Sequence, residues 1–126
     1  MPSLDCPFCA LDENRVITES DHFIVIRDLY PVTPLHTLLV SKTHLDTFFD
    51  LSDDERSELN RVVVEVAESL VSEDGAIKGF NLGANVNEVA GQTVLHFHYH
   101  LIPRRLGDIA DPRGGIRGVI PDKQKY

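Results

Sequence analysis

The sequence lacks any apolar run of the roughly 18 residues that a membrane-spanning helix requires, so we expect no transmembrane helix. Its first residues carry neither the basic stretch nor the apolar stretch of a secretory signal peptide, which favours a cytoplasmic location. The formal net charge is −8, so the chain also lacks the broad basic face that duplex nucleic acid demands. No internal repeat interrupts its 126 residues, and a hydrophobic content of 42% supports one packed domain spanning residues 1–126.

Cysteine is scarce, and the only two, Cys6 and Cys9, form a C-x2-C pair. In a reducing compartment this spacing is typical of half a zinc site or of a redox pair. Nothing places the pair ahead of a helix of the thioredoxin type, and a tetrahedral zinc would need two further ligands. Two free thiols without metal are the alternative.

Strand-like segments and one long helix make up most of the chain, which indicates an α+β fold with the helix on one sheet face. The long helix begins at Ser52, because Ser52 and Glu55 form a capping-box pattern, and Gly75 is its expected stop. A short helical turn is expected just before it, up to Phe49. About five strands are expected, at residues 15–19, 22–27, 37–41, 80–84 and 91–102. The segments at about 1–14 and 104–126 are expected to be irregular.

Three of the six histidines, His96, His98 and His100, alternate with apolar residues in the run 94–102. Successive side chains of a strand point to opposite faces, so the three imidazoles are expected on one face. The other face would carry Leu95, Phe97, Tyr99 and Leu101. Metal binding by all three histidines and a chance cluster are alternatives. The polar residues Gln92 and Thr93, which precede the run, suit a phosphate better than a metal alone.

The run 96–102 resembles the motif of the histidine triad (HIT) family, in which three histidines alternate with apolar residues. Two further segments, 90–94 and 31–44, also resemble this family, and the resemblance covers most of residues 6–105. It implies a HIT-like antiparallel sheet, a homodimer, and hydrolysis or transfer at the α-phosphate of a nucleotide conjugate. Candidate conjugates are dinucleoside polyphosphates, phosphoramidates and adenylylated molecules. The alternative is a purine-nucleotide-binding regulatory module with little turnover.

The resemblance also implies roles for individual residues. His98 would be the nucleophile that forms a nucleotidyl-histidine intermediate, which requires its other ring nitrogen to donate to a fixed acceptor, often a backbone carbonyl. Catalytic support would come from His100, His36 and Gln92. Nucleotide binding would involve Asp28 at the ribose and Asn85, Gln92 and Thr93 at the phosphate.

Many microbial members of the family complete the C-x2-C pair with two histidines. The resemblance therefore implies a structural Zn²⁺ ion held by Cys6, Cys9, His44 and His96. In this interpretation the first triad histidine binds metal, the second attacks phosphorus and the third assists. A metalloenzyme whose zinc performs the chemistry is a competing interpretation.

Two positions depart from the family pattern, because Leu35 and Asn87 stand where glycine is usual. The loop at Leu35 is therefore expected to differ, whereas asparagine tolerates a left-handed backbone and its effect at position 87 should be mild. The C-terminal segment helps to select the leaving group in this family. Arginines in or near it would contact a polyphosphate or form exposed charge: Arg104, Arg105, Arg113 and Arg117.

Overall fold

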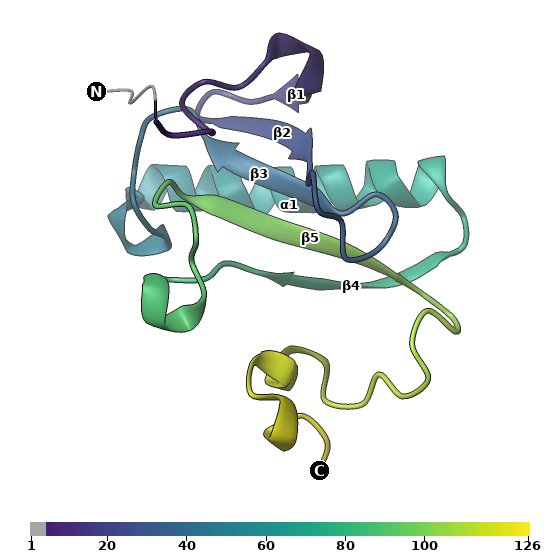
Figure 1. The fold of residues 1–126 in the computed structure, drawn as a ribbon. Helices are drawn as coiled ribbons and strands as arrows, with labels where there is room; N and C mark the ends of the chain where they lie inside the picture. Colours follow the sequence, from purple (N-terminus) through teal and green to yellow (C-terminus); the bar gives the residue numbers. More distant parts are fainter. Residues whose placement is uncertain (1–4) are drawn as a thin grey trace.

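A computed structural model describes residues 5–126, which form a five-stranded antiparallel sheet with one long helix along one face (Figure 1). The strands are β1 (Val16–Glu19), β2 (Phe23–Arg27), β3 (Thr37–Ser41), β4 (Ile77–Gly83) and β5 (His98–Arg105), and the helix is α1 (Asp53–Glu73). The sheet order is β1-β2-β3-β5-β4. The expected α+β fold is confirmed, with single 3-10 turns such as Phe48–Asp50 in place of a second helix. The expected N-terminal segment is described from Asp5 onward.

The start of α1 follows from its first residues. The Ser52 hydroxyl accepts a hydrogen bond from the Glu55 backbone N–H at 3.1 Å, and the Glu55 carboxylate accepts one from the Ser52 N–H at 2.7 Å. This reciprocal pair satisfies two N–H groups that have no partner within the helix. The helix ends at Glu73, two residues before the expected stop at Gly75. In the part of the chain that the structure describes, no helix is long and apolar enough to span a membrane.

The sheet has two different faces because side chains alternate along each strand. Phe23 and Val25 of β2, Leu39 of β3 and Leu101 of β5 point toward α1 and join the main core. The helix contributes a buried stripe to this core, made of Leu59, Val62, Val66 and Leu70. Each such side chain contributes roughly 1.5–3 kcal/mol when it leaves water.

The opposite face carries a smaller apolar cluster of Ile26, Leu38 and Val40, covered by Phe8 and Leu11 of the N-terminal segment. All five residues of β3 are buried because both faces of this strand are covered. Leu38 pairs with His100 and Val40 pairs with His98, so the two histidines lie on the face opposite α1. The face that carries these two histidines is therefore the one opposite the helix.

The predicted fifth strand was wrong at its start. β5 begins at His98 rather than at Gly91, so His96 lies in the loop that leads into the strand. The Gln92 side chain bonds within this loop and to the Asp46 carbonyl, and the Phe97 backbone N–H donates to the Leu45 carbonyl, outside β3. Leu95, expected beside Phe97 on the apolar face, is 52% exposed. The first triad histidine is thereby separated from the other two.

Candidate functional site

The second triad histidine is held in one tautomer by its own strand. The Nδ1 atom of His98 lies 2.8 Å from the backbone carbonyl oxygen of His96. A carbonyl only accepts hydrogen bonds, so Nδ1 carries the proton and donates it. The lone pair of the His98 ring is therefore on Nε2. This is the backbone partner expected for a nucleophilic imidazole.

The third triad histidine is fixed through a chain of hydrogen bonds. The Val32 backbone N–H donates to Nδ1 of His36 at 3.0 Å, so the proton of His36 is on Nε2. That nitrogen lies 2.9 Å from Nδ1 of His100 and donates to it. The remaining nitrogen of His100, Nε2, therefore carries a proton and is a donor. The loop before β3 thus sets the tautomer of a residue on β5.

Burial keeps the imidazole rings of His36 and His100 neutral. Burial lowers the pKa of His36, against the attraction of the Asp28 carboxylate. Burial also lowers the pKa of His100 to about 4, and His98 and His36 add to the effect. Asp28 lies 3.4 Å from Nε2 of His36 and 4.0 Å from Nδ1 of His100. At neutral pH the imidazoles of His36 and His100 are therefore both neutral.

The cluster of Asp28, His36 and His100 also has the composition of a metal site, since its ligand atoms lie within 4.8 Å of one another. The hydrogen bond from Val32 argues against that use. A metal on Nε2 of His36 would require the proton to move to Nδ1, which would then face the Val32 N–H. The geometry fits a hydrogen-bonded relay better than a metal centre.

The predicted phosphate contacts lie in the loop before β5 and differ in their exposure. Thr93 and Asn85 are exposed, whereas Gln92 is buried. The Gln92 amide donates to the carbonyls of Asp46 and Val94 at 2.6 and 3.1 Å, and its oxygen accepts from the Asn87 N–H at 2.8 Å. The side chain of Gln92 therefore organises the loop with its own hydrogen-bonding groups.

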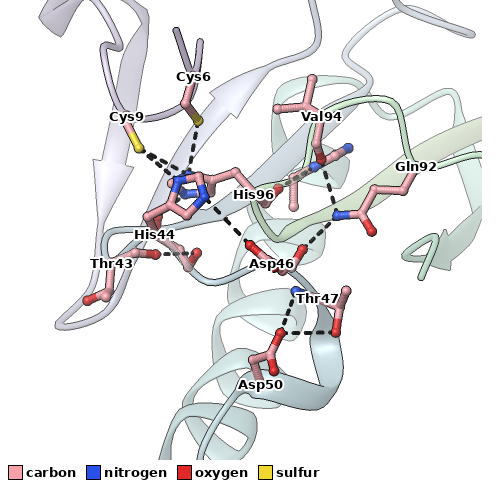
Figure 2. Close-up of polar contacts among 12 residues, drawn as sticks. Cys6, Cys9, Thr43, His44, Asp46, Thr47, Asp50, Gln92, Val94 and His96 are labelled. Atoms are coloured by element: carbon pink, nitrogen blue, oxygen red, sulfur yellow. Dashed lines mark hydrogen bonds and ion pairs between the residues drawn. The ribbon is translucent and has the colours of Figure 1, made fainter. Parts of the chain in front are cut away.

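A second cluster lies beside the first triad histidine (Figure 2). The ligand atoms of Cys6, Cys9, His44 and His96 all lie within 4.8 Å of one another. Nδ1 of His96 is 3.3 Å from the Cys6 sulfur and 3.2 Å from Nδ1 of His44, which is 3.0 Å from the Cys9 sulfur. Edges of this length suit a tetrahedral ion with Zn–S bonds of about 2.3 Å and Zn–N bonds of about 2.0 Å. Two sulfurs and two imidazole nitrogens are also the donors that zinc prefers.

Neighbouring groups orient the two histidines of this cluster. Nε2 of His96 donates to the Ser41 carbonyl at 2.7 Å, which leaves Nδ1 as the lone pair in the cluster. Burial lowers the pKa of His96 and raises the pKa of the Cys6 thiol. Burial therefore favours the neutral thiol of Cys6, and binding a metal through this sulfur would release its proton. The Asp46 carboxylate lies 3.6 Å from Nε2 of His44.

A groove of about 720 Å³ begins at His36 and His100 and extends over β4 and β5 to the C-terminal tail, defined here as residues 106–126. The tail lies beyond β4 (yellow in Figure 1) and carries two 3-10 turns. The Ile116 side chain approaches the backbone of Gly83. A smaller cavity of about 350 Å³ lies between the β1–β2 hairpin and α1, and its lining contains none of the histidines.

One residue beside the site was missed by sequence reasoning. The ring of Phe8, between the two cysteines, lies 4.9 Å from the His98 ring and 5.8 Å from the His96 ring. It thereby connects the cysteine pair to the triad. Its position inside the C-x2-C sequence was the only available signal.

Both departures from the family's glycines have positive φ. Leu35 has φ +70°, which glycine favours and leucine rarely adopts. Asn87 has φ +71° and ψ 163°, so it does not have the left-handed helical conformation that asparagine tolerates. This region is essentially restricted to glycine, so the expectation that Asn87 would have a left-handed helical conformation was wrong.

The comparisons with known proteins agree with this architecture. A family model described as the HIT domain matches residues 11–107. The chain belongs to the histidine triad (HIT) family. An uncharacterised HIT-like protein of Methanocaldococcus jannaschii is 35% identical over 107 residues, which cover 82% of this chain and 81% of that protein.

Two solved HIT-like structures are informative. A zinc-bound histidine triad family protein from Mycobacterium smegmatis has a TM-score of 0.69 and 32% identity, covering 76% of this chain and 69% of that one. A diadenosine triphosphate hydrolase from Plasmodium falciparum has a TM-score of 0.74 and 25% identity, covering 80% of this chain and 68% of that one. The chain spans less than two thirds of the length of several other HIT structures that it matches.

Proposed function

We propose that this HIT protein hydrolyses nucleotide conjugates at the α-phosphate, with His98 as the nucleophile. The observation that carries the proposal is the 2.8 Å contact between Nδ1 of His98 and the His96 carbonyl. It leaves Nε2 unprotonated, as attack on phosphorus requires. The same carbonyl stabilises the positive charge that the ring acquires when it attacks.

The reaction has two steps. In the first, Nε2 of His98 bonds to the α-phosphorus while the bond to the leaving group breaks, and the leaving group departs with that electron pair. In the second, water attacks phosphorus and the N–P bond breaks, which releases the mononucleotide, returns the lone pair to His98 and gives one proton to solvent. The Nε2–H of His100 donates to a non-bridging phosphate oxygen during both steps.

The other site residues bind the nucleotide or position the groups that do so. The Asp28 carboxylate accepts from the ribose hydroxyls, and Thr93 and Asn85 donate to phosphate oxygens. His36 acts through His100, so it is a positioning residue. Gln92 is also a positioning residue, because its amide groups hold the loop that presents Thr93.

The Cys6, Cys9, His44 and His96 cluster would hold a structural Zn²⁺ ion, as its donor set and spacing suit this metal. The ion would tie the N-terminal segment to the loop before β5. Its ligand set is complete with four protein side chains, which leaves no open position for substrate. We also propose that the protein is a homodimer, as the family resemblance implies.

The test is mononucleotide release from a panel of dinucleoside polyphosphates, phosphoramidates and adenylylated molecules. The diadenosine triphosphate hydrolase among the similar structures supports including that compound. We expect turnover that is lost in His98→Ala and retained in His22→Ala, a histidine outside the site. Turnover that persists in His98→Ala would refute the mechanism, and tight nucleotide binding without turnover would favour a regulatory binding module.

A further inference from the structure

Leu35 has an unfavourable backbone conformation in the loop between β2 and β3. Its φ is +70°, a value that leucine rarely adopts. The bend at this residue turns the chain back on itself, because the His36 N–H donates to the Thr33 carbonyl at 3.1 Å and the Val32 N–H reaches Nδ1 of the His36 ring at 3.0 Å. A conformation of this kind persists only where the surrounding contacts enforce it.

Both peptide groups that flank the Cα atom of Leu35 are held by side chains. The Pro34 carbonyl, which belongs to the peptide group before Leu35, accepts from Nη2 of Arg105 at 3.0 Å. The Leu35 carbonyl accepts from the Thr37 hydroxyl at 2.7 Å. Rotation about either backbone bond of Leu35 would move one carbonyl relative to the other, so the two contacts together fix the bend.

Arg105 is held in turn by a carboxylate at the end of α1. Its Nε and Nη2 atoms both lie 3.0 Å from the same oxygen of Asp74, the residue that caps this helix. The Arg105 side chain is only 15% exposed, so it is not the exposed charge considered from the sequence. The β2–β3 loop, the end of α1 and the end of β5 lie at the same end of the sheet (Figure 1). One largely buried guanidinium therefore ties these segments together.

The position of the loop decides which nitrogen of His36 carries the proton. While the Val32 N–H donates to Nδ1, the proton of His36 stays on Nε2 and is donated to His100. If the bend relaxes, Nδ1 loses this donor and both tautomers become accessible. With its proton on Nδ1, His36 cannot donate to His100, and the Nε2–H that His100 directs to phosphate is no longer enforced.

We propose that Arg105 is a positioning residue, which fixes the tautomer of His36 through the bend at Leu35. This inference rests on the proposed function, because the tautomer of His36 matters for the reaction through His100. Arg105 is the last residue of β5 and lies roughly 16 Å beyond His100 along the strand, at about 3.3 Å per residue. Its effect on the reacting phosphate is therefore indirect.

Arg105→Lys tests the inference because it keeps the positive charge. A lysine has a single nitrogen and cannot hold a carboxylate and the Pro34 carbonyl in the planar geometry of a guanidinium. Nitrogen NMR of the isotopically labelled full chain, without substrate, distinguishes protonated from unprotonated ring nitrogens. We expect an unprotonated Nδ1 of His36 in the wild type, and a signal shifted toward the protonated value in Arg105→Lys.

The kinetic effect should follow the tautomer. In Arg105→Lys, kcat for an adenosine phosphoramidate should fall about fivefold, with a smaller change in KM. Because Arg105 acts through His36, this loss should not exceed that of His36→Asn, and combining the two variants should add nothing further. Thermal melting checks folding, and Asp74→Asn, at the anchor of the guanidinium, provides a second variant with the same expected direction.

Two control variants separate positioning from charge and from stability. Arg61→Lys alters an arginine whose ion pair with Glu65 is more than half exposed, and it should leave the NMR signal and kcat unchanged. Glu58→Gln removes the carboxylate that holds the β1–β2 turn, away from this loop, and it should lower Tm without moving the His36 signal.

Three results would overturn the inference. The first is an unchanged His36 signal in both Arg105→Lys and Asp74→Asn. The second is an equal shift of that signal in Glu58→Gln. The third is a fall in kcat without a change of tautomer, which would assign Arg105 a merely structural role. If the wild-type protein cleaves no conjugate, the proposed function fails, and the NMR measurement still decides whether Arg105 fixes the tautomer of His36.

Discussion

Glu58 connects α1 to the turn between β1 and β2, and Glu58→Gln is expected to destabilise the fold by about 2 kcal/mol at pH 7. The carboxylate accepts hydrogen bonds from the Ser20 hydroxyl, from the His22 backbone N–H at 2.8 Å and from the His22 ring at 2.6 Å. The carboxylate side chain is only 10% exposed. Glutamine preserves the shape of the side chain but removes the charge.

The magnitude follows from the pKa of the carboxyl. Burial alone would raise the pKa of Glu58, but the hydrogen bonds from Ser20 and His22 lower it from 4.5 to about 2. One pKa unit corresponds to about 1.4 kcal/mol, so the charged form contributes at most about 3 kcal/mol at neutral pH. The His22 side chain is 49% exposed, and solvent screens its share, which reduces the expected value to about 2 kcal/mol.

The sign of the pH dependence follows from the same pKa. Because the folded-state pKa of Glu58 is below its ordinary value, its stabilisation is present above pH 4.5 and is lost as the pH falls toward 2. The hydrogen bond to Glu58 raises the pKa of His22, although burial opposes this shift. The stabilisation that comes from protonated His22 is therefore present below pH 6.5 and is lost as the pH rises through the raised pKa. The difference between wild type and Glu58→Gln should therefore fall to less than half by about pH 3.

Urea unfolding at pH 7, 4.5 and 3 measures these free energies. Glu65→Gln is the matched control, because Glu65 lies on the same helix and its ion pair with Arg61 is more than half exposed. This control should cost about 0.5 kcal/mol or less. A Glu58→Gln loss no larger than that of Glu65→Gln, or one that does not shrink in acid, would refute the reasoning.

Three further variants address the backbone, the metal cluster and the relay. Asn87→Gly should raise the free energy of unfolding in urea by about 1 kcal/mol, because it relieves a backbone conformation that only glycine adopts readily. The control Asn60→Gly, within α1, should lower it by a similar amount. A change of the same sign and size in both variants would contradict this. For Cys6→Ser, elemental analysis should find well below the one zinc ion per chain expected for the wild type. The variant should also melt at a clearly lower Tm, with a comparatively small change in kcat. An unchanged zinc content would exclude the proposed ligand set. His36→Asn should lower kcat about tenfold or more with a smaller change in KM, because it removes the donor to His100; an unchanged kcat would remove His36 from the relay.

The sequence predicted the elements whose patterns are local. Capping residues at Ser52 and Glu55 set the start of α1, and the segment 37–41 is a strand with the expected bounds. The resemblance to the HIT family also brought Cys6 and Cys9 together with two distant histidines, as the structure does. The helix and strand predictions succeeded because each depended on short-range periodicity or on a capping pattern.

The features that failed depend on tertiary contacts. Alternation of apolar residues and histidines continues through residues 94–102, so nothing in that run marks His98 as the first residue in the ladder. Just before the strand, the Phe97 N–H donates to the Leu45 carbonyl and the Gln92 side chain donates to the Asp46 carbonyl, and both partners are far away in sequence. The bond between His22 and Glu58 is a further example, because it depends on how the β1–β2 hairpin lies against α1.

From the sequence, the tautomer of His98 could be stated only as a requirement of the proposed nucleophilic attack. Its partner, the His96 carbonyl, lies two residues away, and that contact depends on the loop geometry just before β5. The hydrogen-bond chain from Val32 through His36 to His100 could not be predicted from the sequence either, because it depends on how two separate segments are placed relative to each other. Chemistry that depends on which nitrogen carries a proton requires a structure.

The most direct test of the central claim is mass spectrometry of the protein quenched during turnover of an adenosine phosphoramidate. The account predicts a transient increase by one adenylyl group, located on the peptide that contains His98 and absent in His98→Ala. The adduct should decay as mononucleotide appears. An adduct on another residue, or rapid turnover with no adduct in a single-turnover time course, would contradict nucleophilic catalysis by His98.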